Sequence, residues 1–215
     1  MTTTTRDEIV GYIKRNRVSS TEIADVLGKS GAIENIRALN PGHFRVAPVK
    51  WVYLFEESNW PLHEQIANIE EGHVIVVDTF DCNGRAAFGD IVAKYLLLYR
   101  QSEAVVVSGN VRDAHRLIKE NWPIWCEGFN PVGCFNRKPT GALDENRLAA
   151  RRAIYEGSIA VCDDTGVVII PEAEQTEDFV SRLEFIEEQE DIWYECIDRR
   201  KWSTFKTICE KAYLT

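Results

Sequence analysis

The stretches VIVVD at residues 74–78 and AVVVSG at residues 104–109 decide the fold. Each begins with four consecutive apolar residues, Val74–Val77 and Ala104–Val107. A short continuous apolar run of this kind is typical of a strand that is buried on both faces. Such strands occur in parallel sheets with helices on either side, so the two stretches predict the centre of an α/β fold.

Outward from these strands, helices and further strands are predicted to alternate. The expected helices cover residues 6–16, 19–27, 61–69, 90–100 and a segment ending at Glu120, and the expected strands cover 44–55, 124–126 and a hairpin of 158–161 with 166–170. Residues 127–150 are expected to be irregular. We therefore predict one α/β domain with a mixed sheet over residues 1–215, with N-terminal helices in 1–30 and a helical C-terminal extension in 174–215.

The balance of charge argues against two broad classes of function. The 215 residues include 25 Lys and Arg against 34 Asp and Glu, so the formal net charge is −9. Binding to nucleic acid or to an anionic membrane surface depends on clustered Lys and Arg, so neither partner is expected. A membrane-spanning helix needs about 18 or more apolar residues in succession, and the sequence has no such stretch.

The N-terminus and the cysteines indicate the compartment. Residues 1–10, MTTTTRDEIV, lack the apolar segment of a secretory signal. No pair among the six cysteines has CxxC spacing, and no Cys and His cluster has the spacing of a zinc site. We therefore expect a cytoplasmic protein whose cysteines are reduced thiols.

Polar residues follow both central strands where each strand ends. Asp90 begins the helix after the first strand, and Arg112 and Asp113 follow the second. Ligands of open α/β sheets collect at the carboxyl ends of the strands, and the free amides of a helix start, here Gly89–Val92, can hold a carboxylate. Carboxylates also suit Mg²⁺ or Mn²⁺, and arginine pairs with anions. The pattern indicates a site for an anion and a divalent metal.

Simpler interpretations of these features remain open. An aspartate at a helix start, as at Asp90 or Asp113, is often only a partner for the helix dipole. Residues 19–33 have a sequence pattern similar to the start of a helix-turn-helix, which would indicate a regulator, although no basic recognition helix follows. The four histidines are scattered along the sequence, and we expect surface or core positions for them rather than metal ligation.

The order of several motifs resembles the RraA-like family. The matching stretches are Ser20–Gly28, Gly72–Asp78, Gly89-Asp90, Val105–Asp113, Pro123–Gly128, Glu156–Val161 and Asp164–Pro171. The family includes the regulators of ribonuclease E activity and the class II 4-hydroxy-4-methyl-2-oxoglutarate aldolases, which also decarboxylate oxaloacetate. This sequence differs from the aldolase pattern by one additional residue between Asp90 and Arg112, and by Ser108 where the aldolases usually have aspartate.

The resemblance implies a swivelling β/β/α fold and a homo-oligomer, either a trimer or a dimer of trimers, with sites between subunits. In the aldolases of this family one acidic residue of the site comes from the C-terminal helix of a neighbouring subunit. Glu190 is the best-placed candidate for that residue, and Glu187 stands behind it.

The resemblance also implies roles for the residues after the central strands. Asp113 would bind Mg²⁺ (or Mn²⁺) directly, and Asp90 would hold the water molecules bound to the metal. Arg112 would bind the carboxylate or keto oxygen of a 2-oxo acid. The amides around Ile91 and Val92 would hold the carboxylate.

Two functions follow as hypotheses. The first is a divalent-metal-dependent lyase for a small 2-oxo acid, acting by retro-aldol cleavage of a 4-hydroxy-2-oxo acid or by decarboxylation of oxaloacetate through a metal-stabilised enolate. The second is a non-catalytic RraA-like regulator that binds a protein partner such as a ribonuclease.

Overall fold

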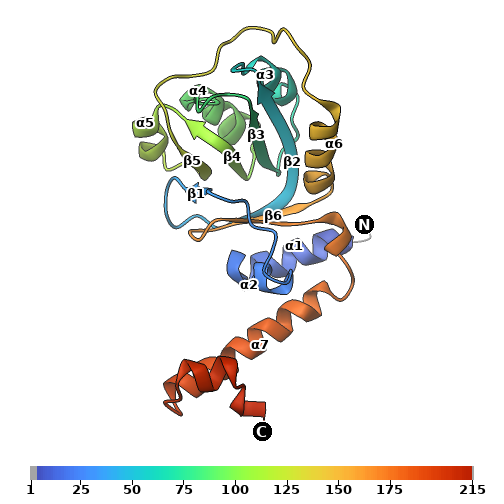
Figure 1. Ribbon diagram of the computed structural model, residues 1–215, viewed down its shortest axis with the longest axis vertical. Helices are drawn as coiled ribbons and strands as arrows, with labels where there is room; N and C mark the ends of the chain where they lie inside the picture. The colour runs from blue at the N-terminus through green and yellow to red at the C-terminus, as the bar shows by residue number, and fades with distance from the viewer. Residues whose placement is uncertain (1–3, 215) are drawn as a thin grey trace.

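A seven-stranded mixed sheet with the order β1-β5-β4-β3-β2-β6-β7 forms the centre of the protein in the computed structural model, which describes residues 4–214 (Figure 1). Its strands are β1 (Arg37–Ala38), β2 (Arg45–Phe55), β3 (Val74–Phe80), β4 (Ala104–Val111), β5 (Ile124–Phe129), β6 (Ile159–Cys162) and β7 (Val167–Ile170). Strands β2 to β5 run parallel, whereas β6 and β7 form the predicted antiparallel hairpin. The predicted α/β class and mixed sheet are confirmed.

Helices and short helical turns surround this sheet. They are α1 (Thr5–Asn16), α2 (Ser20–Val26), α3 (Trp60–Ile66), α4 (Asp90–Lys94), η1 (Tyr95–Tyr99), α5 (Ala114–Lys119), α6 (Glu145–Tyr155), η2 (Glu172–Glu174), α7 (Phe179–Asp198), η3 (Phe205–Cys209) and η4 (Ala212–Leu214). In Figure 1, α3, α4 and α5 lie around the parallel strands, and α1 and α2 lie beneath β6. No helix among the described residues is long and apolar enough to cross a membrane.

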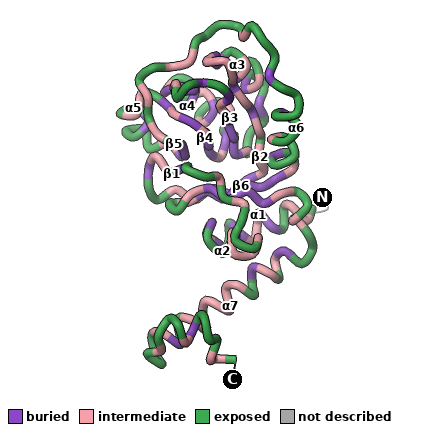
Figure 2. The backbone as a smooth tube through the Cα atoms, in the orientation of Figure 1, coloured by how far each residue is buried: buried purple, intermediate pink, exposed green. Residues whose placement is uncertain are grey.

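The central strands are buried on both faces, as their apolar runs predict. Ile75 and Val77 pack into a core shared with α3, α4 and α5. Val74 and Val76 face the opposite core, which includes Tyr155 of α6 and the hairpin. A third core lies between the hairpin and the helices α1, α2 and α7. The buried segments in Figure 2 follow this layering.

Helix α2 begins as its sequence predicts, but no second helix follows it within residues 19–33. The Ser19 hydroxyl accepts a hydrogen bond from the Glu22 amide at 3.2 Å, and the Glu22 carboxylate accepts one from the Ser19 amide at 2.6 Å. This reciprocal capping box fixes the helix start. The next helix in the chain is α3, beyond strands β1 and β2, so the helix-turn-helix alternative is wrong.

Helix α6 begins inside the segment 127–150, so the prediction that this whole segment is irregular is wrong. The Asp144 carboxylate caps the helix by accepting a hydrogen bond from the Arg147 amide at 2.9 Å. Leu148 and Tyr155 are the buried residues of the helix. Two apolar anchors seven residues apart, on a helix that is otherwise mostly polar, give little periodic signal in the sequence.

Pro48 marks a change of partner within β2. Residues 45–48 of β2 pair antiparallel with β6, and residues 49–55 pair parallel with β3. Proline has no amide hydrogen to donate to a ladder, so this change of partner suits it.

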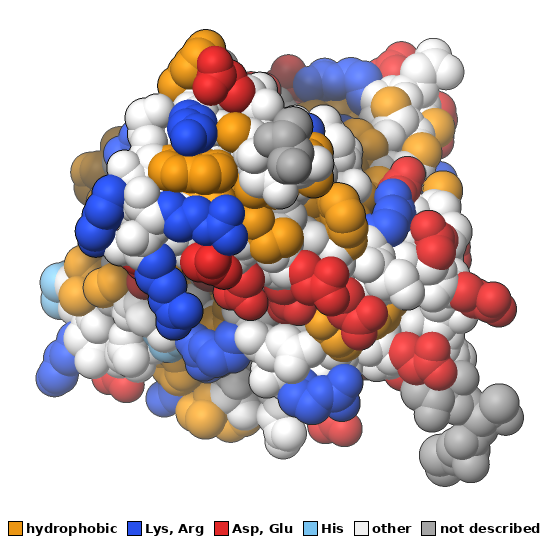
Figure 3. Space-filling view, turned by 90° about the horizontal axis from the view of Figure 1, so that it is seen from below, with side chains coloured by type: hydrophobic (Ala, Val, Ile, Leu, Met, Phe, Trp, Pro, Cys, Tyr) orange, Lys and Arg blue, Asp and Glu red, His pale blue; other side chains and the backbone are white. Residues whose placement is uncertain are grey.

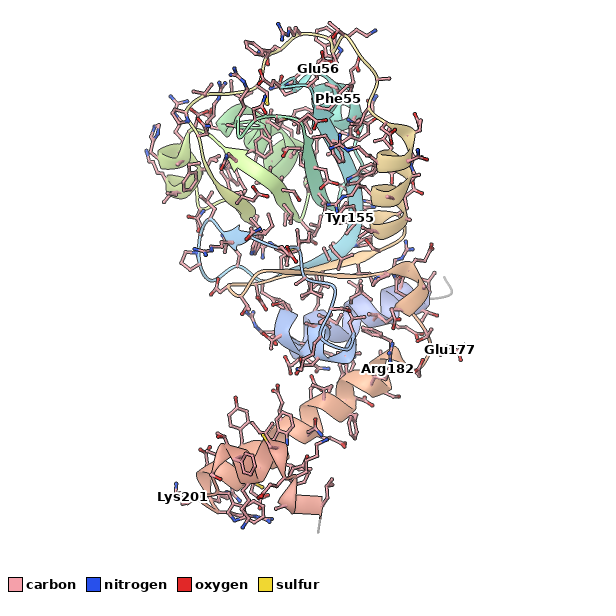
Figure 4. All side chains as sticks on the ribbon, viewed as in Figure 1. Phe55, Glu56, Tyr155, Glu177, Arg182 and Lys201 are labelled. Carbon is pink, nitrogen blue, oxygen red and sulfur yellow. The ribbon has the colours of Figure 1, made fainter. Side chains whose placement is uncertain are left out.

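The C-terminal extension is helical but interrupted. Helix α7 leaves the body of the protein and carries the chain to a small group of turns near Lys201 (Figure 4). There the Trp202 amide donates a hydrogen bond to the Cys196 carbonyl at 3.0 Å, and the Trp193 indole donates one to the Tyr213 hydroxyl at 3.2 Å. Seen from below, acidic and basic side chains lie interspersed with apolar ones (Figure 3).

Candidate functional site

The end of β4 and the segment before α4 are held together by backbone hydrogen bonds. The Ala87 amide donates to the Asn110 carbonyl at 2.8 Å, and the Arg112 amide donates to the Phe88 carbonyl at 2.9 Å. Both segments follow buried strands of the same sheet, β3 and β4, which are neighbours. The start of α4 and the residues after β4 therefore lie side by side.

A cavity of about 130 Å³ lies at this place, at the carboxyl ends of the parallel strands. Among the residues that line this cavity are six that the sequence predicts for the site: Gly89, Asp90, Ile91, Val92, Arg112 and Asp113. Six of the seven predicted site residues thus meet in one pocket.

Asp113 is held in this pocket by an unusual backbone conformation. Its φ of 59° and ψ of 31° are left-handed, and its side chain does not cap α5. The carboxylate instead accepts a hydrogen bond from the Asp90 amide at 3.3 Å. It occupies the space beside Gly89, where an added Cβ would lie 2.0 Å from the Asp113 Oδ2 atom. Gly89 therefore leaves room for the carboxylate.

Arg112 lies on the wall of the same pocket. Its Nε atom is 3.7 Å from Asp113 Oδ2, and its side chain is 48% exposed. The guanidinium lies against Gly133, since a Cβ added there would be 2.6 Å from Arg112 Nη1. With this exposure the guanidinium is available to a dissolved anion, for which its planar fork is suited.

Asp90 has a partner that the sequence reasoning missed. The Arg116 Nη1 atom, on α5, donates a hydrogen bond to Asp90 Oδ2 at 2.6 Å. This bond and the positive charge of Arg116 lower the pKa of the Asp90 carboxyl, and a hydrogen bond from the Ile91 amide contributes further.

We predict that Arg116→Ala raises the pKa of the Asp90 carboxyl toward its ordinary value, because the largest cause of the lowering is removed. An NMR titration of the carboxyl carbon measures this shift. Arg152→Ala, which removes a comparable exposed pair with Glu156, is the control and should leave Asp90 unchanged. An unchanged Asp90 pKa in Arg116→Ala would contradict the prediction.

The same pair gives stability a defined pH dependence. A carboxyl whose pKa is lowered by folding stabilises the protein above its unfolded value of about 3.9, and this contribution is lost as the pH falls through the lower folded pKa. The stability difference between wild type and Arg116→Ala should therefore be present at neutral pH and shrink below about pH 4.

Eight residues that line the pocket were not predicted from the sequence, and four of them have polar or thiol side chains: Asn59, His63, Cys134 and Asn136. Asn59 is 8% exposed, and its Oδ1 atom is buried without a hydrogen-bond partner. His63 follows it by one turn of α3 and is exposed. These residues come from segments far from the central strands in the sequence, and no local spacing links them to Asp90 or Arg112.

Glu190 does not line the pocket of its own chain. It lies on α7 near α2, where burial raises the pKa of its carboxyl and the nearby Glu22 and Asp25 raise it further. Its predicted role requires a neighbouring subunit and stays a prediction.

The donor set of the pocket fits a divalent cation in part. Asp90 and Asp113 supply carboxylate oxygens, the ligand type that Mg²⁺ prefers. The space that Gly89 leaves open lets the Asp113 carboxylate reach the pocket. Within residues 4–214, no group of three or more His, Cys, Asp or Glu side chains is placed to hold a metal ion. One chain therefore offers two carboxylates, and further ligands would come from substrate, water or a second subunit.

A curated protein has a similar sequence over most of this chain. Protein DlpA of Legionella pneumophila is 29% identical over 165 residues, which are 71% of this chain and 26% of that protein. The chain thus spans about a quarter of the length of this relative.

Solved structures show the same fold. A protein from Pseudomonas syringae has a TM-score of 0.66 at 21% identity, covering 93% of this chain and 95% of that one. RraAS2 from Streptomyces coelicolor, described as an unusual member of the RNase ES inhibitor RraA family, has a TM-score of 0.62 at 23% identity, covering 86% and 94%.

A family model described as RraA-like, Aldolase/RraA, matches residues 20–169. This span holds the parallel strands, the hairpin up to Ile169 and the whole pocket described above. The chain therefore belongs to the RraA-like family.

Proposed function

We propose that this protein is a divalent-metal-dependent lyase for a small 2-oxo acid. The observation that carries the proposal is the meeting of Asp90, Arg112, Asp113 and the start of α4 in one pocket. Family membership supports it, because the family model includes aldolases. The substrate class is an acid with a 2-keto group that loses a fragment by retro-aldol cleavage or loses CO₂ from the β-position.

Different residues of the pocket would bind different groups of the substrate. Arg112, half exposed on the wall, pairs with the substrate carboxylate or its keto oxygen. The Val92 amide at the helix start adds a donor for the same carboxylate. The unpartnered Asn59 Oδ1 can accept the hydrogen of a substrate hydroxyl and so orient the bond that breaks.

Asp113 and Asp90 would hold the cation, Mg²⁺ or Mn²⁺, with Asp113 the direct ligand. When bound, the metal supplies Lewis-acid stabilisation of the negative charge that develops on the keto oxygen as the carbon–carbon bond breaks. Arg112 supports the same developing charge. In retro-aldol cleavage the 4-hydroxyl group would lose its proton to a water molecule beside Asp90 as its carbon becomes a carbonyl, whereas in decarboxylation CO₂ leaves. In both reactions the electron pair of the broken bond moves to the carbon next to the keto group, which then takes up a proton to give pyruvate.

We further propose a homo-oligomer, a trimer or a dimer of trimers, in which Glu190 of one subunit reaches the pocket of its neighbour. The incomplete ligand set within one chain supports this arrangement. Sedimentation velocity should show a species larger than the monomer, and a monomer would contradict the proposal.

The test of the lyase proposal is the release of pyruvate from oxaloacetate and from 4-hydroxy-4-methyl-2-oxoglutarate. We expect turnover with Mg²⁺ and its loss on chelation, recovered by added Mg²⁺ or Mn²⁺. Arg112→Ala should lower kcat/KM by about 100-fold or more, because it removes a charge that the transition state needs. No metal-dependent turnover of either substrate, or full activity of Arg112→Ala, would contradict the proposal for these substrates.

A second function, regulation through binding of a protein partner such as a ribonuclease, is favoured by exposed apolar residues beside the pocket. Ile91 on α4 and Ile118 on α5 are 78% and 50% exposed. One similar structure is described as the RNA-processing inhibitor RraA from Thermus thermophilis, and another, RraAS2, as an unusual member of the RNase ES inhibitor family. If Ile91→Ser and Ile118→Ser bind a purified ribonuclease as well as wild type does, this face is not the partner surface.

A further inference from the structure

A second, larger cavity lies at the carboxyl ends of the parallel strands, on the opposite face of the sheet. Its volume is about 470 Å³, and it is lined by strand ends, by α6 and by the segment 31–35. Ser108 of β4 reaches it, whereas Arg112 and Asp113 of the same chain segment reach the first pocket. The two cavities share no lining residue.

Arg151, which lines this cavity, forms an ion pair with the buried Asp78. Asp78 is 2% exposed and accepts two hydrogen bonds from Arg151, from Nε at 2.7 Å and from Nη2 at 2.8 Å. The Trp51 indole donates a third to the same carboxylate at 2.8 Å. These bonds balance the charge of Asp78 and fix the Arg151 guanidinium at the cavity. The Tyr155 hydroxyl accepts a hydrogen bond from Arg151 Nη2, and the Tyr155 side chain lies between α6 and the sheet (Figure 4).

Hydrogen-bond donors at this inner end lack acceptors. The Ser108 Oγ atom is buried and has no hydrogen-bond partner among the described residues. The bonds to Asp78 use Nε and Nη2 of Arg151, which leaves Nη1 for another acceptor. Tyr155 accepts from Arg151 and retains its own hydroxyl hydrogen for donation. Buried polar groups without partners are rare in native proteins, so these donors indicate an acceptor that the chain itself does not supply.

The outer rim has the opposite character. Glu34 and Glu127 line the opening and are exposed, so the rim attracts a positive charge. Between the rim and the inner donors the wall is apolar, formed by Ile33, Ile154 and Ile169. A simple anion would meet the acidic rim, and a simple amine would leave the inner donors unpaired.

We propose that this cavity binds a small zwitterion, an α-amino acid with an aliphatic side chain. The carboxylate of the ligand accepts hydrogen bonds from Ser108, Tyr155 and Arg151, and its ammonium group lies toward Glu34 and Glu127. The aliphatic side chain packs on the isoleucine wall, where burial of apolar surface favours binding. This site is separate from the candidate lyase pocket, and binding there does not depend on lyase activity.

The experiment titrates the full-length protein with L-leucine by calorimetry and by NMR. Two matched probes each lack one charged group: 4-methylpentanoate lacks the ammonium and has no keto group that would suit the lyase pocket, and 3-methylbutylamine lacks the carboxylate. We expect leucine to bind at least about tenfold more tightly than either probe, since each charged group makes charge-assisted bonds. Absence of leucine binding, or binding of either probe with the same affinity as leucine, would overturn the proposal.

Variants assign the binding to this cavity. Ser108→Ala and Glu127→Gln should each weaken leucine binding by about tenfold. The matched controls are Ser102→Ala, which removes another buried hydroxyl without a partner, and Glu120→Gln at the end of α5, and both should bind as wild type does. Arg112→Ala should also retain binding. Leucine binding that Arg112→Ala abolishes, or that Ser108→Ala and Glu127→Gln leave unchanged, would overturn the assignment.

Discussion

Gly89→Ala should lower metal-dependent pyruvate release by about 100-fold or more while the protein remains folded. The backbone of Gly89, with φ of −136°, accepts alanine without strain. The new Cβ, however, would lie 2.0 Å from Asp113 Oδ2 and 2.9 Å from Arg112 Cγ. Both side chains must move away, and a displacement of about 1 Å in a catalytic group costs roughly this factor in rate. Steady-state kinetics with oxaloacetate and Mg²⁺ measure the loss.

Gly11→Ala is the matched control for this substitution. Gly11 lies within α1, and an added Cβ there meets no atom within 4 Å. It should leave kcat unchanged and raise stability by about 0.5–1 kcal/mol, because alanine favours a helix interior. If Gly89→Ala keeps wild-type activity, Asp113 and Arg112 do not act from the positions described above.

Asp78→Ala should destabilise the protein by about 3 kcal/mol. The Asp78 side chain is 3% exposed and Arg151 is 33% exposed, so removing the carboxylate leaves a largely buried guanidinium without its partner. The Trp51 indole also loses its acceptor. Urea denaturation, followed by tryptophan fluorescence, measures the change in the free energy of unfolding. Asp78→Asn keeps a side-chain oxygen as an acceptor for Trp51, so its free energy of unfolding should fall by less than that of Asp78→Ala.

The comparison for this prediction is Asp81→Ala. Asp81 pairs with Arg147 at 2.8 Å, but both side chains are about half exposed or more, at 63% and 48%. Pairs in water contribute little, so this variant should change stability by no more than about 0.5 kcal/mol. If Asp78→Ala lowers the free energy of unfolding by as little as Asp81→Ala does, then burial does not strengthen the pair of Asp78 and Arg151.

The central strands could be predicted because burial on both faces leaves a continuous apolar run. Val74–Val77 and Ala104–Val107 have this signature, and both lie inside longer strands. Helix α6 has no comparable signal, because only Leu148 and Tyr155 are buried along it. Its contribution to the second cavity, through Arg151, was therefore invisible in the sequence.

The candidate site was predictable to the extent that its residues follow strands. Asp90 and Arg112 were found because neighbouring parallel strands bring their carboxyl ends to one edge. Asn59 and His63, which line the pocket, and Arg116, which pairs with Asp90, were missed because their positions depend on the packing of α3 and α5 in the tertiary structure. The pairing of Arg116 with Asp90 joins two helices that no sequence spacing connects.

The left-handed backbone of Asp113 has a consequence for the balance between stability and activity. A non-glycine residue in this conformation costs about 1 kcal/mol relative to glycine, and the Asp113 side chain recovers none of it by capping α5. Asp113→Gly would relieve that strain and also remove the carboxylate from the pocket. A residue kept against its local conformational preference is typical of a position selected for what its side chain does. Under the proposed function, this protein accepts a less stable turn in order to present that carboxylate.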